Sequence, residues 1–277
     1  MTDLVEIGAD VEWPDNEAAA SLRARRATDA DQGALDEHAE WLAGVQGSDP
    51  PRDFRRVRVV AFHGAGCSPD VTGLAAATVR CAGSLPESTA EAIAAGIALA
   101  DEEIDGGADL LIAALPAAGT EAAVLVSVLT NTEPVKVLPR TMAPDAWMAQ
   151  TAAVRDGRRR AYALRGSPAE LLAAAGTPEL AAATGFVLRA ATRRTPVLLD
   201  GLFATVAALV AYEAQPRAVR WWRAADLSTH PAHAIALTRL GQQPILNLGT
   251  TLADGTAGVL ATAVLRAAVQ ISGAPQG

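Results

Sequence analysis

The protein has 277 residues, a formal net charge of −8 and a sequence pI of about 5.0. Half of its residues are hydrophobic, which excludes a mainly disordered chain. The acidic balance argues against non-specific nucleic-acid binding, because such binding needs a basic face.

The N-terminal part, residues 1–50, is polar and charge-rich, with helices expected at residues 16–26 and 33–45. Glycine and proline then break the chain at residues 47–51. A β-branched run at residues 57–62 predicts a strand that ends in a glycine-bearing loop. In the following stretch the pattern predicts helices at residues 89–105 and 120–129, and strands at residues 109–115 and 135–138.

The second half repeats this alternation of short apolar strands and longer helices. Helices are expected at residues 145–160, 178–193, 202–213, 232–240 and 256–271, and strands at residues 195–199, 219–222 and 244–248. Such alternation predicts an α/β fold with a parallel, Rossmann-like sheet flanked by helices.

Cysteine content and hydropathy indicate where the protein resides. The two cysteines, Cys67 and Cys81, are too few for a disulfide framework, and we expect no bridge between them. The first residues lack the basic stretch and apolar core of a signal peptide. No segment approaches the roughly 20 apolar residues that span a bilayer. We therefore expect a soluble cytoplasmic protein that does not bind membranes.

Ligands of open parallel sheets bind beyond the carboxyl ends of the strands. In this chain that rule selects the loops at residues 63–68, 116–120, 200–201, 226–233 and 250–258. None of these loops is a P-loop, a dinucleotide-binding glycine motif or a nucleophile elbow, and no metal-ligand cluster is present at helical spacing.

Several residues in these loops have both a structural and a functional interpretation. Asp200 either caps the helix that follows it or contacts a substrate hydroxyl. Asp254 stands directly before a helix, where an aspartate commonly caps the helix. His230 and His233 lie three residues apart with Asp226 nearby, but they are more readily explained as polar loop residues than as metal ligands.

Four stretches resemble one known family in the right order. They are residues 100–111 (ADEEIDGGADLL), 151–156 (TAAVRD), 193–201 (RRTPVLLDG) and 252–257 (LADGTA). The chain resembles the nicotinate-nucleotide:dimethylbenzimidazole phosphoribosyltransferases, which make the lower-ligand nucleotide of cobalamin. The similarity is strongest over residues 100–269, and weaker similarity reaches back to residue 33.

The resemblance implies a reaction and a site. Enzymes of this family move 5-phosphoribose from nicotinate mononucleotide to dimethylbenzimidazole, while a carboxylate takes the proton of the base. By position, the catalytic carboxylate would be that of Asp254. The substrate-binding residues would be Gly119, Thr120, Asp200, Gly201, Ser228, His233, Gly255 and Thr256.

The resemblance also implies an organisation and a set of partners. Residues 1–50 and the helix at 256–277 would form a small helical domain, and residues 51–255 the α/β phosphoribosyltransferase-like domain. The family is dimeric, so we expect a homodimer that binds a nucleotide or benzimidazole substrate. No metal and no cofactor are implied.

The chain departs from the family pattern at the phosphate site. The family loop GEMGIGNTT falls on residues 114–122, where one glycine survives and Pro116 removes a backbone donor. The phosphate-binding lysine of the family aligns with Gln150, and the glutamate of its S-x-E element aligns with His230. The segment between Cys67 and Ala90, beside the expected benzimidazole site, is shorter than in the family.

Three hypotheses follow from these matches and departures. The first is a phosphoribosyltransferase with a degraded phosphate site. The second is a catalytically inactive or altered paralogue that binds a cobalamin precursor or base, or acts as an interaction subunit. The third is a related transferase that uses another base or a nucleoside without phosphate.

Overall fold

The computed structural model describes residues 3–27, 31–62, 72–116 and 119–273. The loop expected at residues 63–68 and Cys67 therefore lie outside the described residues, and so the expectation about a disulfide is not tested.

A parallel sheet of five strands forms the centre of the fold, as predicted. Its strands are β1 (Val57–Ala61), β2 (Thr78–Cys81), β3 (Leu110–Ala114), β4 (Val197–Asp200) and β5 (Trp222–Ala224). They run in the order β2-β1-β3-β4-β5. Ala114 pairs with Ala61 on one side and with Asp200 on the other, so the carboxyl ends of β1, β3 and β4 are level. Because helices cover both faces, β3 is a continuous apolar run.

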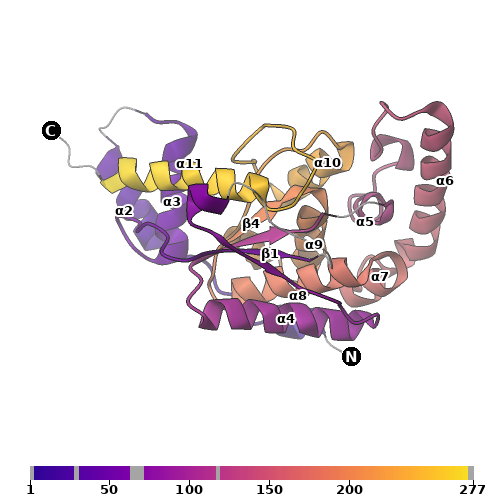
Figure 1. Cartoon of the computed structure of the whole chain (residues 1–277), viewed down its shortest axis with the longest axis horizontal. Coiled ribbons are helices and arrows are strands. Elements are labelled where there is room, and N and C mark those ends of the chain that lie inside the picture. The colour runs from indigo at the N-terminus through magenta and orange to yellow at the C-terminus, as the bar shows by residue number, and fades with distance from the viewer. Residues whose placement is uncertain (1–2, 28–30, 63–71, 117–118, 274–277) are drawn as a thin grey trace.

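The helices lie on both sides of this sheet. They are α1 (Leu4–Gly8), α2 (Asn16–Arg26), α3 (Ala34–Gln46), α4 (Thr89–Asp105), α5 (Glu121–Leu129), α6 (Pro144–Ala161), α7 (Pro168–Ala175), α8 (Pro178–Thr192), α9 (Gly201–Ala214), α10 (Pro231–Leu240) and α11 (Thr256–Gly273). Helices α2 and α6 pack mainly on other helices. In Figure 1, α4 and α8 lie side by side below the sheet, and α11 runs along the opposite side.

Glycines set the close approach of α4 and α8. A Cβ atom added at Gly96 would overlap the carbonyl group of Ala182, and one added at Gly185 would overlap the carbonyl of Ile93. The two backbones therefore touch directly, which only glycine permits at these positions.

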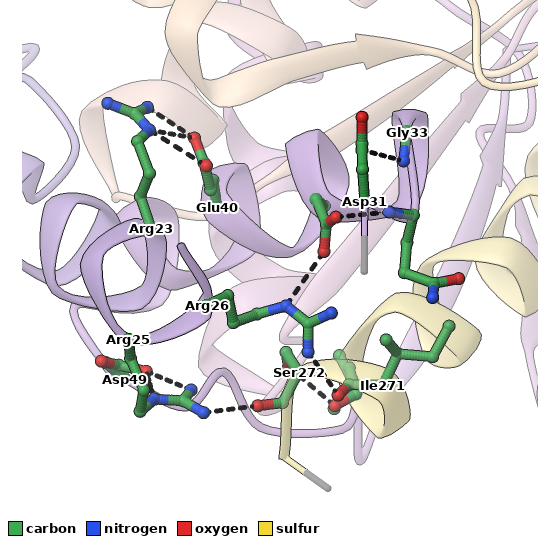
Figure 2. Close-up of polar contacts among 12 residues, drawn as sticks. Arg23, Arg25, Arg26, Asp31, Gly33, Glu40, Asp49, Ile271 and Ser272 are labelled. Atoms are coloured by element: carbon green, nitrogen blue, oxygen red, sulfur yellow. Dashed lines mark hydrogen bonds and ion pairs between the residues drawn. The ribbon is translucent and has the colours of Figure 1, made fainter. Parts of the chain in front are cut away.

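The N-terminal helices pack against the C-terminal helix. Leu22 of α2, Ala39 and Ala43 of α3, and Ala268 of α11 form a small buried cluster. Figure 2 shows the polar contacts beside this cluster, where arginines of α2 reach the last turn of α11. The division of the chain at residues 50 and 255 remains a prediction.

Three predicted strands are wrong or displaced. Residues 135–138 contain the 3-10 helix η2 (Pro134–Lys136), because Pro134 starts a turn. The strand expected at 219–222 begins later, at Trp222, since residues Pro216–Trp221 form the 3-10 helix η4. Residues 244–248 make only an isolated bridge, between Leu246 and Asp226.

Other elements were missed by the sequence reasoning. Strand β2 is an edge strand that is largely exposed, so it lacks a buried pattern, and α7 is a short helix of eight residues. By length and composition α11 could cross a membrane, although Arg266 interrupts it and it does not reach the roughly 20 apolar residues named above. Its buried residues pack against β3, β4 and α3, as in the core helix of a globular protein.

Candidate active site

A cavity of about 720 Å³ lies where the strands end, and we call it the carboxyl-edge cavity. Its wall is built from the segments that follow β3, β4 and β5. Its polar and charged lining residues are Arg140, Thr141, Gln150, Ser228, Thr229, His230, Thr250 and Thr251, and its other lining residues include Gly119, Met142, Gly201, Phe203 and Ala253.

Three of the predicted site residues line this cavity: Gly119, Gly201 and Ser228. Gly201 has a φ of 82°, and a Cβ atom there would overlap Ala253, so glycine is required where α9 begins. The other six predicted residues are not among the lining residues: Thr120, Asp200, His233, Asp254, Gly255 and Thr256.

The start of α5, where the family pattern places the phosphate, carries a carboxylate of the protein itself. Gly119 has a φ of 141°, and a Cβ atom added there would overlap the carboxyl group of Glu121. A glutamate in the first turn stabilises the positive end of the helix dipole. The same negative charge opposes the binding of a phosphate at this helix start.

Asp200 is a buried helix cap, and it caps a different helix from the one expected. It is 1% exposed, and its Oδ2 accepts a hydrogen bond of 3.0 Å from the backbone N–H of Gly258 in α11. Burial raises the pKa of Asp200 to about 6, and the charges of Asp254 and Asp226 act in the same direction. Asp200 thereby fixes the start of α11 over the end of β4.

Asp226 organises the opposite wall, a role that the sequence reasoning did not assign. Its Oδ1 accepts a hydrogen bond of 2.6 Å from the N–H of Leu248. Its Oδ2 accepts from the N–H and the hydroxyl of Thr250, at 2.8 and 2.7 Å. The carboxylate is buried, so these bonds hold the loop whose next residues line the cavity.

His233 links two loops of the site from behind the wall. Its Nδ1 accepts from the N–H of Ser228 at 3.1 Å, and its Nε2 lies 2.9 Å from the hydroxyl of Thr205. Since Nδ1 must accept, Nε2 carries the proton and donates to Thr205, which donates in turn to the carbonyl of Gly201. Burial lowers the pKa of His233 to about 4, so the ring is neutral, and both nitrogens are occupied. Because both ring nitrogens are hydrogen-bonded, His233 is not available as a metal ligand.

Asp254 caps the first turn of α11. Its Oδ1 accepts a 3.0 Å hydrogen bond from the N–H of Thr256, which is the capping role considered from sequence. The preceding residue, Ala253, lines the cavity and has a positive φ of 52°. Asp254 is half-buried, and no carboxylate lines the cavity within residues 72–116 and 119–273 or the other described ranges.

The cationic and polar groups of the cavity come from segments for which the sequence predicted no site residue, or predicted a different role. Arg140 is exposed and makes no hydrogen bond or ion pair within the described part of the chain. Gln150, which aligns with the lysine of the family, also lines the cavity. His230 accepts from the N–H of Ala232 through Nδ1, and burial lowers its pKa. Arg140 follows η2, in a stretch without any recognised motif, so no sequence signal marked it.

Comparisons with known proteins place this geometry in a family. Residues 84–274 match the phosphoribosyltransferase family. A nicotinate-nucleotide–dimethylbenzimidazole phosphoribosyltransferase from Mycobacterium avium (strain 104) is 42% identical, and the alignment covers 94% of this chain and 93% of that protein. The protein of the same name from Mycobacterium marinum is 41% identical, covering 94% and 91%. The crystal structure of such an enzyme from Thermus thermophilus superposes with a TM-score of 0.84 at 26% identity, over 95% of this chain and 97% of that one.

The alignment with the Mycobacterium avium relative extends over 325 positions, which exceeds the 277 residues of this chain. That relative therefore has residues without a counterpart here, in keeping with the shortening expected from sequence, whose location between Cys67 and Ala90 remains a prediction. The fold, the family match and the two relatives agree, and the chain belongs to the nicotinate-nucleotide:dimethylbenzimidazole phosphoribosyltransferase family.

Proposed function

We propose that the protein transfers 5-phosphoribose from nicotinate mononucleotide to dimethylbenzimidazole in cobalamin lower-ligand assembly, using an altered phosphate site. The observation that carries this proposal is the carboxyl-edge cavity, in which Gly119, Gly201 and Ser228 come together from three different loops. Its volume of about 720 Å³ is in the usual range of small-molecule sites.

In this proposal Arg140 holds the phosphate of the mononucleotide. It replaces the charge that the family lysine supplies, because Gln150 is neutral and the start of α5 carries Glu121. A guanidinium group that has no carboxylate partner is available for a bidentate contact with phosphate oxygens.

The chemical step needs only positioning and removal of one proton. A ring nitrogen of the base attacks the anomeric carbon of the ribose while the bond from that carbon to the pyridinium nitrogen of nicotinate breaks. The bond electrons stay on that nitrogen, so nicotinate leaves as a neutral ring. The N–H proton of the attacking base passes to the carboxylate of Asp254, whose Oδ2 has no hydrogen bond within the described residues.

The test is to incubate the protein with nicotinate mononucleotide and dimethylbenzimidazole and to measure the release of nicotinate. We expect turnover in the wild type, and a loss of at least about 100-fold in Asp254→Asn, as for removal of a general base. The matched control is Asp10→Asn, since Asp10 is exposed and far from the cavity in sequence. Equal turnover by Asp254→Asn and the wild type would show that Asp254 is not the base.

One observation favours a second function, binding without transfer. Among the residues that the structure describes, no carboxylate lines the cavity, and Glu121 opposes phosphate at the start of α5. An inactive or altered paralogue would bind dimethylbenzimidazole or a cobalamin precursor, measured by calorimetry, and would release no nicotinate. Release of nicotinate from the riboside, but not from the mononucleotide, would indicate the third function, a transferase for nucleosides.

We also propose that the protein is a cytoplasmic homodimer that works without a metal or a cofactor. The family resemblance supports these assignments. Light scattering of the purified protein measures the oligomeric state, and an unchanged rate after treatment with a chelator is the result expected for the metal.

A further inference from the structure

A second cavity, of about 480 Å³, lies at the other end of the sheet, and we call it the amino-edge cavity. Helix α9 starts at Gly201 in the carboxyl-edge cavity and ends near Tyr212, which lines the second cavity. Its wall also includes Trp13, residues of α3, residues just before and within β5, and the end of α10 with the residues after it. The two cavities are thus on opposite edges of the sheet, and the second has no part in the proposed transfer.

Three arginines line this cavity: Arg217, Arg220 and Arg223. Within the described residues, none of them forms an ion pair with a carboxylate. Among the described lining residues Glu37 is the one acidic side chain, and His38 beside it is held neutral, because burial lowers its pKa to about 4. The wall therefore carries an excess of positive charge in a protein with a formal net charge of −8.

Arg223 is the most constrained of the three. Its guanidinium lies 4.7 Å from the ring centre of Trp41, and its one hydrogen bond goes to the carbonyl of Trp222. Burial lowers the pKa of Arg223 to about 10, the charge of Arg220 adds to the effect, and the charge of Glu37 acts in the opposite direction. A partly buried cation that forms no ion pair within the described residues is costly, and an anion that approached it would reduce that cost.

Other contacts partly offset the charges of these arginines. Arg220 stacks over Trp13 at 5.7 Å, and the carboxyl ends of α9 and α10 present the negative ends of their dipoles nearby. These contacts are individually weak, and they leave guanidinium N–H groups of Arg217 and Arg220 in solvent. Several guanidinium groups around one polar cavity match the oxygens of a phosphate group, with its several acceptors.

We propose that the amino-edge cavity is a binding site for a small phosphate-bearing anion, held by Arg217, Arg220 and Arg223. The site is distinct from the cavity in which the transfer takes place. The ligand class is a phosphate monoester or a pyrophosphate, small enough for a space of about 480 Å³. Binding there does not require an active transferase.

Calorimetric titration with pyrophosphate and with inorganic phosphate tests this site. The key variant is Arg217→Ala/Arg220→Ala, because both side chains are exposed and their loss leaves the core intact. The matched control is Arg159→Ala/Arg160→Ala, which removes the same charge from an exposed face of α6. We expect the wild type, the control and Arg140→Ala to bind pyrophosphate at the amino-edge cavity with similar affinity, and the key variant to bind there at least tenfold more weakly.

Three results would overturn the proposal. No binding by the wild type at millimolar pyrophosphate would show that the cavity does not take phosphate. Equal weakening in the control variant would show that only net charge matters. A loss in Arg140→Ala with none in Arg217→Ala/Arg220→Ala would assign the binding to the carboxyl-edge cavity. Turnover of nicotinate mononucleotide by the key variant is expected to equal that of the wild type, so this test is independent of the proposed transfer.

Discussion

Two buried carboxylates, Asp200 and Asp226, shape the carboxyl-edge cavity without facing it. Asp200 holds the start of α11, and Asp226 holds the loop at residues 248–250. Each carboxylate accepts backbone N–H groups that would otherwise be unsatisfied where helices and loops begin. The residues that do line the cavity are mostly neutral, so its charge is set by Arg140 and by Glu121 next to Gly119.

A change at Glu121 is expected to strengthen phosphate binding. Glu121→Thr removes the negative charge beside Gly119 and leaves the positive end of the α5 dipole free for an anion. We expect nicotinate mononucleotide to bind about five- to tenfold more tightly, on the order of 1 kcal/mol for one like charge near the surface. Calorimetric titration measures the affinity for nicotinate mononucleotide. The matched control is Glu17→Thr, in the first turn of α2. Unchanged affinity would place the phosphate elsewhere in the cavity.

Asp200 is expected to make stability depend on pH in the direction opposite to an ordinary surface aspartate. Burial raises its pKa from 3.8 to about 6, so the folded state holds the proton more tightly than the unfolded state. The contribution of this group to stability is full below about pH 4 and falls as the pH rises to about 6. The largest change in the free energy of unfolding that this group can cause is about 3 kcal/mol, from the size of the pKa shift.

The variant Asp200→Asn isolates this effect. Asparagine keeps an acceptor for the N–H of Gly258 and cannot ionise. We expect the difference in Tm between variant and wild type to move in favour of the variant as the pH rises from 4 to 7. His233 titrates in the same range with the opposite sign, because its pKa is lowered to about 4, but it is present in both proteins. A difference in Tm that does not change with pH would contradict this account of Asp200.

At the scale of elements, close packing of helices was the feature least visible in the sequence. Apolar periodicity predicted α4 and α8, but not that Gly96 and Gly185 bring their backbones into contact. The predicted strand at residues 244–248 failed for a related reason. Ile245 and Leu246 do pair with Ala224 and Ala225, but the pairing is too short to form a strand. Local pattern gives the type of an element, whereas its partners decide its length.

The same distinction between local pattern and tertiary packing explains which residues of the candidate site could be predicted from the sequence. Gly119, Gly201 and Ser228 were placed by the family resemblance, and the loops that carry them were selected independently because each follows a strand, and such loops meet at one edge of the sheet. Arg140 was not found, since it lies between η2 and α6, in a segment that follows no strand, and lines the cavity through tertiary packing. Asp254 was placed from the resemblance, and the structure shows its capping bond.

The contact between α4 and α8 gives a prediction for Gly96. Gly96→Ala places a methyl group against the backbone carbonyl of Ala182, which cannot move without shifting α8. We expect a loss of about 2 kcal/mol or more in the free energy of unfolding, measured by denaturant titration. Gly166→Ala is the control, because no atom lies within 4 Å of its added Cβ. Equal stability of the two variants would mean that the helices can separate without cost.

At the scale of the whole molecule, helix α2 near the N-terminus is hydrogen-bonded to helix α11 near the C-terminus. Arg25 donates to the carbonyl of Ser272 at 2.9 Å, and Arg26 to that of Ile271 at 2.8 Å. These carbonyls belong to the last turn of α11, where no residue of the helix itself can bond them. Figure 2 shows both arginines reaching the same turn. Since Asp200 and Asp254 fix the other end of α11, the helix is capped by distant segments at both ends.

Removal of the C-terminal caps is expected to loosen the end of α11 and leave its start in place. Arg25→Ala/Arg26→Ala deletes two cationic donors to α11, at a cost of about 1–3 kcal/mol once their partial exposure is allowed for. Hydrogen exchange should accelerate in the last two turns of α11 and stay unchanged near Gly258, which Asp200 holds. Arg23→Ala is the matched control, because Arg23 pairs with Glu40 on α3 and not with α11. Uniformly faster exchange along α11 would show that the helix opens as one unit, and the chain ends would then support the active-site wall as well as each other.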